Sequence, residues 1–278
     1  VESTMSHAFS LFAVALFMYY GTKTYGQKTE KQFFFFGLLG ALMTLIRYQN
    51  GLFMLFPLFE LTDRIVSPNW RKTGIYRLFR RGAAFLFGFL LGIVPQLVVW
   101  KIIYGDFLLY TYKTEGFQNT SGGAESTSHF IDILFSLNHG LIAWTPILLF
   151  CLLGLAFFIH DYKKFGLFFL LLFLGQYLIN ANWQGWSFGV SYSSRAFVNC
   201  TFIFCAGLAA LLNHCSLSMR YILPSLFGFI GWNFLLIIQY TFGYIPLKGV
   251  YTWSQICTNQ LIVLKDIMHL LLPLSGMG

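Results

Sequence analysis

Residues 82–104 read GAAFLFGFLLGIVPQLVVWKIIY, and this stretch decides the class of fold. Lys101 is its only charged residue, and nearly all of the others are apolar. A helix that crosses a lipid bilayer needs roughly 20 consecutive, predominantly apolar residues. The stretch meets that length, so we expect it to form a membrane-spanning helix.

Comparable apolar segments recur along the 278-residue chain, at 5–21, 32–46, 51–62, 140–159, 165–181, 196–212 and 221–242, with a weaker one at 258–273. Charged residues make up only 10% of the chain, whereas a soluble domain carries about 25%. We therefore expect an all-α, polytopic integral membrane bundle of about 8–9 apolar segments, in a single transmembrane domain over 1–278. The segments 32–46 and 51–62 are short for a span and are expected to be tilted, short or re-entrant helices.

The basic residues favour one orientation in the membrane. With the N-terminus outside, twelve of the 18 Lys and Arg residues fall in four loops on the inner side: 22–31, 63–81, 160–164 and 213–220. Cytoplasmic loops are enriched in Lys and Arg, so 63–81 is predicted to be a basic cytoplasmic loop. The net charge of +8 is explained by basic loops that orient the protein and contact membrane lipids. No nucleic-acid partner is expected.

Two loops then lie on the outer side. The loop 105–139 has a Gly/Ser/Thr-rich core, which fits a mobile lid over a site as well as it fits a plain connector. The loop 183–195 reads WQGWSFGVSYSSR, which is richer in aromatic residues than a simple turn requires. We interpret it as part of a binding surface at the outer face.

In this loop, Trp183 and Trp186 are suited to stack on sugar faces or to contact a lipid chain. Each tryptophan, taken alone, is better explained as an anchor at the membrane interface. Tyr192 adds a hydroxyl group. Arg195 places a positive charge on the outer side, where the orientation rule does not require one. We predict that the loop binds a ligand.

A second polar cluster follows the short segment 32–46, where Arg47, Gln49 and Asn50 come together, and we predict that these three residues bind substrate. Charged groups at membrane depth are costly, so they are functional candidates by default. The planar guanidinium of an arginine offers paired donors to a phosphate. The alternatives for Arg47 are an interaction with lipid headgroups and an ion pair with a carboxylate.

Three further polar residues flank apolar segments on the outer side. Glu2 is a candidate carboxylate base or metal ligand, and His7 a candidate for phosphate binding or proton transfer. Both are equally compatible with a terminal flank that has no chemical role. His139, a candidate for substrate binding, opens the segment that continues with Trp144 and Pro146, a proline that can kink the helix. The sequence contains no HxxxH, HExxH or CxxC pattern, so it predicts no metal site.

Three places in the chain resemble one family, the C-type glycosyltransferases that use polyprenyl-phosphate-linked sugars. Residues 5–10, MSHAFS, open a span as in bacterial members of the family. Residues 37–56 resemble its Gly-rich helix followed by an Arg-Pro-Gln-Asn-like turn, with Tyr48 in place of the proline. Residues 139–146, HGLIAWTP, together with 183–189 and Arg195, are similar to its Gly-Leu-x-x-x-x-Pro and Trp-x-Gly-x-Ser-x-Gly-x-Arg patterns.

The resemblance implies transfer of a sugar from a polyprenyl-phosphate carrier to an acceptor at the outer face of a bacterial inner membrane, facing the periplasm. It implies that the catalytic Asp lies in an N-terminal portion missing from this chain, together with any carboxylates that bind a divalent metal. No cofactor is visible in the chain itself. Arg47 and Arg195 are then the expected phosphate ligands. A non-catalytic membrane scaffold, or a lipid-binding subunit with membrane-protein partners, is the alternative.

Overall fold

The computed structural model describes residues 6–66, 74–108, 129–183, 186, 192–215, 218–245 and 251–271. Their secondary structure is helical throughout, with no β-strand among the residues described, as the sequence predicts. The contacts divide the chain into two compact units. Unit 1 contains residues 1–115, 168–176 and 198–202, and unit 2 contains the remainder. The single domain over 1–278 stays a prediction.

Among the residues that the structure describes, four helices are long and apolar enough to cross a membrane, so the chain is a membrane protein. They are α5 (Ile75–Tyr104), α9 (Lys163–Ala181), the continuous η2 (Arg195–Cys200) and α10 (Thr201–His214), and α11 (Met219–Thr241). A shorter apolar helix, α8 (Ile147–Asp161), adds to them. The count of eight to nine membrane segments stays a prediction, because the other helices do not meet the same criteria of length and hydropathy.

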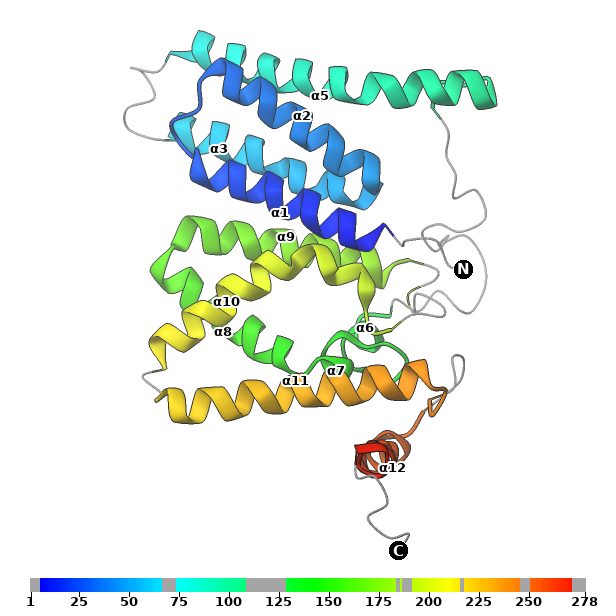
Figure 1. The fold of residues 1–278 in the computed structure, drawn as a ribbon. Coiled ribbons are helices and arrows are strands. Elements are labelled where there is room, and N and C mark those ends of the chain that lie inside the picture. Colours follow the sequence, from blue (N-terminus) through cyan, green and yellow to red (C-terminus); the bar gives the residue numbers. More distant parts are fainter. Residues whose placement is uncertain are drawn as a thin grey trace, which may run out of the picture. The chain divides into compact units, whose positions relative to one another are not determined.

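Unit 1 is built from α1 (His7–Lys23), α2 (Glu30–Ile46), η1 (Tyr48–Met54), α3 (Leu55–Val66) and α5 (Figure 1). Thr29 begins α2 with a capping box. The Thr29 side chain accepts a hydrogen bond from the backbone N–H of Gln32, and the Gln32 side chain accepts one from the backbone N–H of Thr29. Such a reciprocal pair satisfies two amide groups that a helix start leaves without partners. The core is aromatic, and Phe17 stacks on Phe36 with ring centroids 4.2 Å apart.

Glycines set the close crossing of α2 and α5. A Cβ atom on Gly37 would lie 2.0 Å from the Phe85 carbonyl oxygen, and one on Gly88 would lie 2.1 Å from that of Phe34. Small residues let the backbones of membrane helices approach closely, so that van der Waals contacts between them replace the missing hydrophobic driving force. The sequence GFLLG at 88–92 is therefore a packing element of α5.

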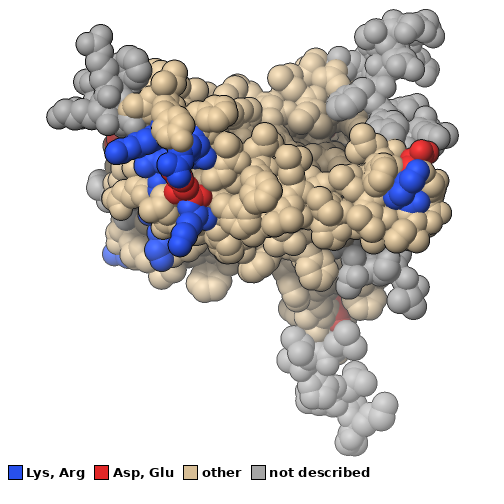
Figure 2. Space-filling view, turned by 90° about the horizontal axis from the view of Figure 1, so that it is seen from above, with Lys and Arg blue, Asp and Glu red and all other residues tan. Residues whose placement is uncertain are grey.

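The charge on α5 is confined to its ends. Arg77, Arg80 and Arg81 lie in its first turns and Lys101 in its last. Figure 2 shows Lys and Arg gathered at one end of this face, with a broad uncharged area between them and a small charged group at the other end. The uncharged part, 82–100, is roughly 28 Å long at 1.5 Å per residue. That length matches the hydrocarbon core of a bilayer, about 30 Å.

Unit 2 contains α6 (Asp132–Phe135), α7 (Leu141–Trp144), α8, both ends of α9, most of α10, α11 and α12 (Trp253–Leu271). The tight crossing here joins α8 and α10. A Cβ atom on Gly154 would lie 2.0 Å from the Gly207 carbonyl oxygen, and one on Gly207 would lie equally close to that of Cys151. The two helix backbones are therefore in direct contact.

Three expected boundaries differ from the structure. Residues 140–159 form two helices, because Pro146 has no amide hydrogen to continue α7 and instead begins α8 as its N-cap. Residues 51–62 begin as the 3-10 helix η1 before α3. The basic stretch 63–81 is loop-like in sequence, yet its two ends belong to α3 and α5. Its middle lies outside the described residues.

Candidate functional site

Arg47 occupies the position where α2 ends and η1 begins, with an extended backbone (φ −153°, ψ 129°). Its Nη1 atom lies 2.8 Å from Nδ1 of His7, and its Nη2 atom donates to Oε1 of Gln49 at 2.9 Å. Three predicted site residues are thus brought together within unit 1. The contacts hold the guanidinium plane in one orientation, which is the arrangement that paired hydrogen bonds to an anion need.

Asn50 lies next to this group but takes part in a different network. Its side chain is fully buried, and its nitrogen donates to Ser10 Oγ at 2.8 Å and to the Met43 carbonyl at 2.9 Å. Its oxygen accepts from Asn199 at 2.6 Å. Buried polar groups are costly unless they are hydrogen-bonded, and here the protein itself satisfies them. Asn50 therefore joins three helical segments of unit 1 and positions the turn that carries Arg47.

In unit 2, His139 is 2% exposed and lies just before α7. Its backbone φ is +69°, a left-handed conformation that is uncommon for residues other than glycine. The ring lies 5.1 Å from Trp144 and 6.5 Å from Tyr240, and no side-chain or backbone group among the described residues hydrogen-bonds to its Nδ1 atom. Burial, with a smaller contribution from the charge of Arg195, lowers the pKa of His139 to about 4. His139 is therefore neutral at pH 7.

Tyr192 completes an aromatic cluster around His139. Its ring meets Trp144 edge-on at 5.2 Å and Tyr240 at 6.0 Å. Its hydroxyl donates to Asn233 on α11, whose backbone and side-chain oxygens both lie at 3.2 Å. Burial raises the pKa of Tyr192. Since the cluster rests on a core of Ala143, Leu236, Ile245, Tyr251 and Ile256, its rings are held in place.

Arg195 begins η2 two residues after Ser193, whose φ of +54° turns the chain. The Arg195 amide donates to the Ser193 carbonyl at 3.0 Å, and the Ser193 hydroxyl lies 3.5 Å from that of Thr145. The turn at Ser193 thus contacts the residue that caps the end of α7. The charge of Arg195 also contributes to the lowered pKa of His139. Arg195 therefore lies beside the aromatic cluster. We call His139, Trp144, Tyr192, Arg195 and Tyr240 the His139 cluster.

The remaining predicted residues lie elsewhere. Trp186 stacks on His129 with ring centroids 4.7 Å apart, and His129 in turn pairs with Asp132 at 3.0 Å. Trp183 follows α9, with its amide 3.3 Å from the Asn180 carbonyl. Neither is among the described partners of the His139 cluster. Glu2 and most of the lid candidate 105–139 lie outside the described residues.

A large apolar groove lies in unit 2, with a volume of about 910 Å³. Its walls come mainly from α8, α10 and α11, and it is almost free of polar atoms; residues that line it include Pro146, Phe150, Leu208, Leu211, Phe229 and Trp232. Two of its lining residues lie near the His139 cluster: Pro146 is two positions after Trp144, and Trp232 packs against the core on which the cluster rests. The groove therefore brings apolar surface close to this aromatic and cationic group.

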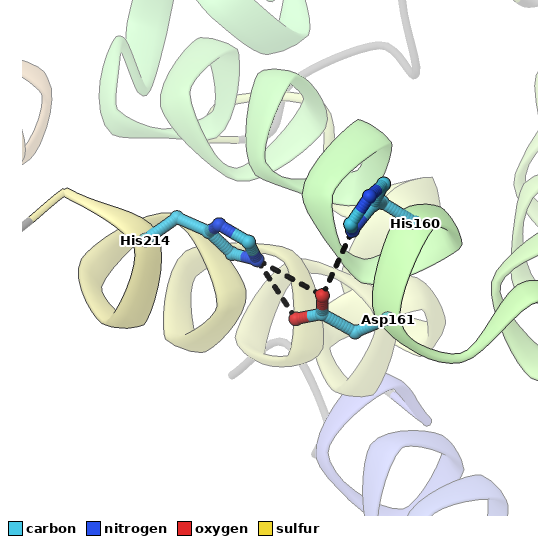
Figure 3. Close-up of side chains that lie close together, drawn as sticks. All are labelled: His160, Asp161 and His214. Carbon is cyan, nitrogen blue, oxygen red and sulfur yellow. Dashed lines mark hydrogen bonds and ion pairs between the residues drawn. The ribbon is translucent and has the colours of Figure 1, made fainter.

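A further group of polar residues, which the sequence did not indicate, lies where α8 and α10 end. Figure 3 shows His160 and His214 pointing toward the carboxylate of Asp161. Nδ1 of His160 lies 3.1 Å from Asp161 Oδ1, and Nε2 of His214 lies 2.9 Å from Oδ2. These hydrogen bonds lower the pKa of Asp161. The group combines residues more than 50 positions apart in the chain, so a search for local spacing patterns could not find it.

Comparisons with known proteins do not assign a family. No protein-family model, no curated protein and no solved structure matches the chain. The fold therefore defines the class, an all-helical membrane protein, and the sites have to be interpreted from their own chemistry.

Proposed function

We propose that this protein is a membrane glycosyltransferase that moves a sugar from a polyprenyl-phosphate carrier to an acceptor at the outer face, with this chain supplying donor-binding helices and loops. The observation that carries the proposal is the closeness of the apolar groove to the His139 cluster in unit 2, since Trp232 of the groove wall and Tyr192 and Tyr240 of the cluster pack against one core. A polyprenyl phosphate has the matching layout, with a long apolar tail joined to an anionic headgroup.

Each part of the donor has a counterpart in this unit. The groove of about 910 Å³, lined by α8, α10 and α11, would take part of the isoprenoid chain. Arg195 would donate to the phosphate, because guanidinium groups form strong charge-assisted hydrogen bonds with phosphate oxygens. The sequence resemblance described above supports the same ligand. Arg47, held by His7 and Gln49 in unit 1, is a second candidate for contact with an anion.

The proposal is tested by binding of undecaprenyl phosphate to the purified protein in detergent. Arg195→Gln is expected to weaken binding by about 10- to 100-fold, which corresponds to the loss of one charged hydrogen bond. Arg77→Gln is the matched control, since Arg77 is exposed in the first turns of α5 and does not line the groove. Equal affinities for the wild type and Arg195→Gln would contradict the phosphate role of Arg195.

The groove has its own test. Leu211→Trp places a larger side chain on its wall and is expected to weaken binding of undecaprenyl phosphate more than that of farnesyl phosphate, which has a much shorter tail. Leu86→Trp is the control, because Leu86 is exposed on α5. If Leu211→Trp leaves the affinity for the long-tailed lipid unchanged, the groove is not its binding site.

The second candidate function is a lipid-binding scaffold without catalysis. It is favoured by the composition of the His139 cluster, which includes no carboxylate, although sugar transfer commonly uses one as general base. A transfer assay with a radiolabelled polyprenyl-phosphate hexose in native membranes distinguishes the two. Binding without any transfer of label would support the scaffold and contradict the enzyme.

A further inference from the structure

We propose that His160, Asp161 and His214 bind one divalent transition-metal ion, Zn²⁺, at the ends of α8 and α10. The two imidazole nitrogens and the carboxylate oxygens lie within 4.8 Å of one another. Imidazole nitrogen and carboxylate oxygen are common zinc ligands, at about 2.0–2.2 Å from the ion. Three protein ligands leave a further coordination position for water or an external group.

The spacing of the ligand atoms fits a shared ion. Asp161 Oδ1 lies 3.1 Å from Nδ1 of His160 and 3.0 Å from Nε2 of His214. Two ligands about 2.1 Å from one ion are about 3.0–3.4 Å apart at the angles that zinc accepts. The two imidazole nitrogens, which lie within 4.8 Å of each other, have to approach to the same range, and rotation of the exposed His160 side chain allows this. The same atoms that now share hydrogen bonds would face the ion.

The helices themselves favour a cation at this position. Asp161 is the last residue of α8 and His214 is the last residue of α10. The C-terminal end of a helix carries partial negative charge from carbonyl groups that lack partners in the helix. Two such ends converge here, and their field partly offsets Lys163 and Lys164 at the start of α9, which oppose cation binding.

The ligands are also positioned and accessible. The His214 ring stacks on Phe157 of α8 with centroids 4.9 Å apart, which limits its rotation. The side chain of His160 is 80% exposed, while those of Asp161 and His214 are 27% and 32% exposed. An ion can thus enter from solvent and meet two ligands that are already in place. Once bound, it would tie α8 to α10.

The experiment uses the full chain in detergent, purified without a polyhistidine tag and treated with EDTA. Titration with Zn²⁺ by calorimetry is expected to give one site per chain. Co²⁺ is expected to give visible absorption bands of a low-coordinate site. His160→Gln, which alters an exposed side chain and leaves the fold intact, is expected to reduce Zn²⁺ affinity at least about tenfold, because a ligand is lost. His214→Gln should do the same.

His129→Gln is the matched control, since His129 pairs with Asp132 at 3.0 Å but belongs to no group of three ligands among the described residues. It should leave Zn²⁺ affinity unchanged. The proposal is overturned if the wild type binds less than one ion per chain, or if His160→Gln and His214→Gln bind Zn²⁺ as tightly as the wild type. Either result would show that the three residues form a hydrogen-bonded group and do not bind Zn²⁺ as a site. Neither outcome depends on the binding of polyprenyl phosphate.

Discussion

Gly207 is the position where one added methyl group has the clearest consequence. In Gly207→Ala the new Cβ atom would lie 2.0 Å from the Cys151 carbonyl oxygen and 3.1 Å from the Leu155 amide nitrogen. Ordinary contact begins at 3.4 Å, so α8 and α10 would have to separate by about 1.4 Å. Both atoms nearest to the methyl group belong to the backbone, and no side-chain rotation can relieve the clash.

The expected cost is about 1–3 kcal/mol, which is typical of overpacking a close-packed interior. For a chain of this size, a loss of that order lowers the apparent melting temperature by roughly 2–10 °C. Thermal unfolding of the protein in detergent, followed by far-UV circular dichroism, measures the shift. The same displacement moves Asp161 away from His214, so Gly207→Ala should also weaken Zn²⁺ binding.

Gly231→Ala is the control for this prediction. A Cβ atom at Gly231 of α11 would have no atom within 4 Å. Alanine is the better helix former by about 1 kcal/mol, so this variant should melt at the wild-type temperature or slightly above it. If Gly207→Ala melts within about 1 °C of Gly231→Ala, the helices are not in the backbone contact that we describe.

Two other perturbations test buried polar groups. The pKa of His139 is lowered to about 4 from 6.5. Between pH 6.5 and about 4 the unfolded chain therefore binds more protons at this residue than the folded chain does. The free energy of unfolding falls as the pH is lowered through this range, by at most about 3 kcal/mol in total. His139→Asn should remove this component of the pH dependence of the melting temperature, and asparagine tolerates the left-handed backbone at this position. Parallel curves of melting temperature against pH for the wild type and the variant would contradict the prediction. Lys28 is fully buried and pairs with Glu60 at 2.5 Å. Lys28→Met leaves that carboxylate without its main partner and should destabilise the fold by about 3–5 kcal/mol, with Lys31→Met, at an exposed position, as the control.

The helices could be predicted because their signal is local. Long apolar runs and the turn residues between them depend only on neighbouring positions, and α5, α9, α10 and α11 follow the expected segments closely. The division at Pro146 was also present in the sequence, since a proline inside an apolar run breaks the helical hydrogen bonds. It was interpreted as a kink, whereas the structure ends one helix and begins another.

The sites were only partly predictable, because their partners come from distant segments. Arg47 and His7 were each identified, but nothing in the sequence indicates that they meet at 2.8 Å. Asn50 was predicted to bind substrate, and the structure shows its side chain bonded to Ser10 and Asn199. The His160 group was missed for the same reason, as its third member is on another helix.

Lys28 makes a long-range contact of this kind, which bears on the predicted orientation of the chain in the membrane. It was counted among the cytoplasmic charges, yet it donates to Glu60 and to the Gly21 carbonyl inside unit 1. Its cation lies 4.9 Å from the Phe36 ring centroid, away from lipid headgroups. Removing it from the count of twelve leaves eleven basic residues in the predicted inner loops against six elsewhere. The bias that places Arg47, His139 and Arg195 on the outer side therefore does not depend on Lys28, and it is carried by the basic residues around the start of α5.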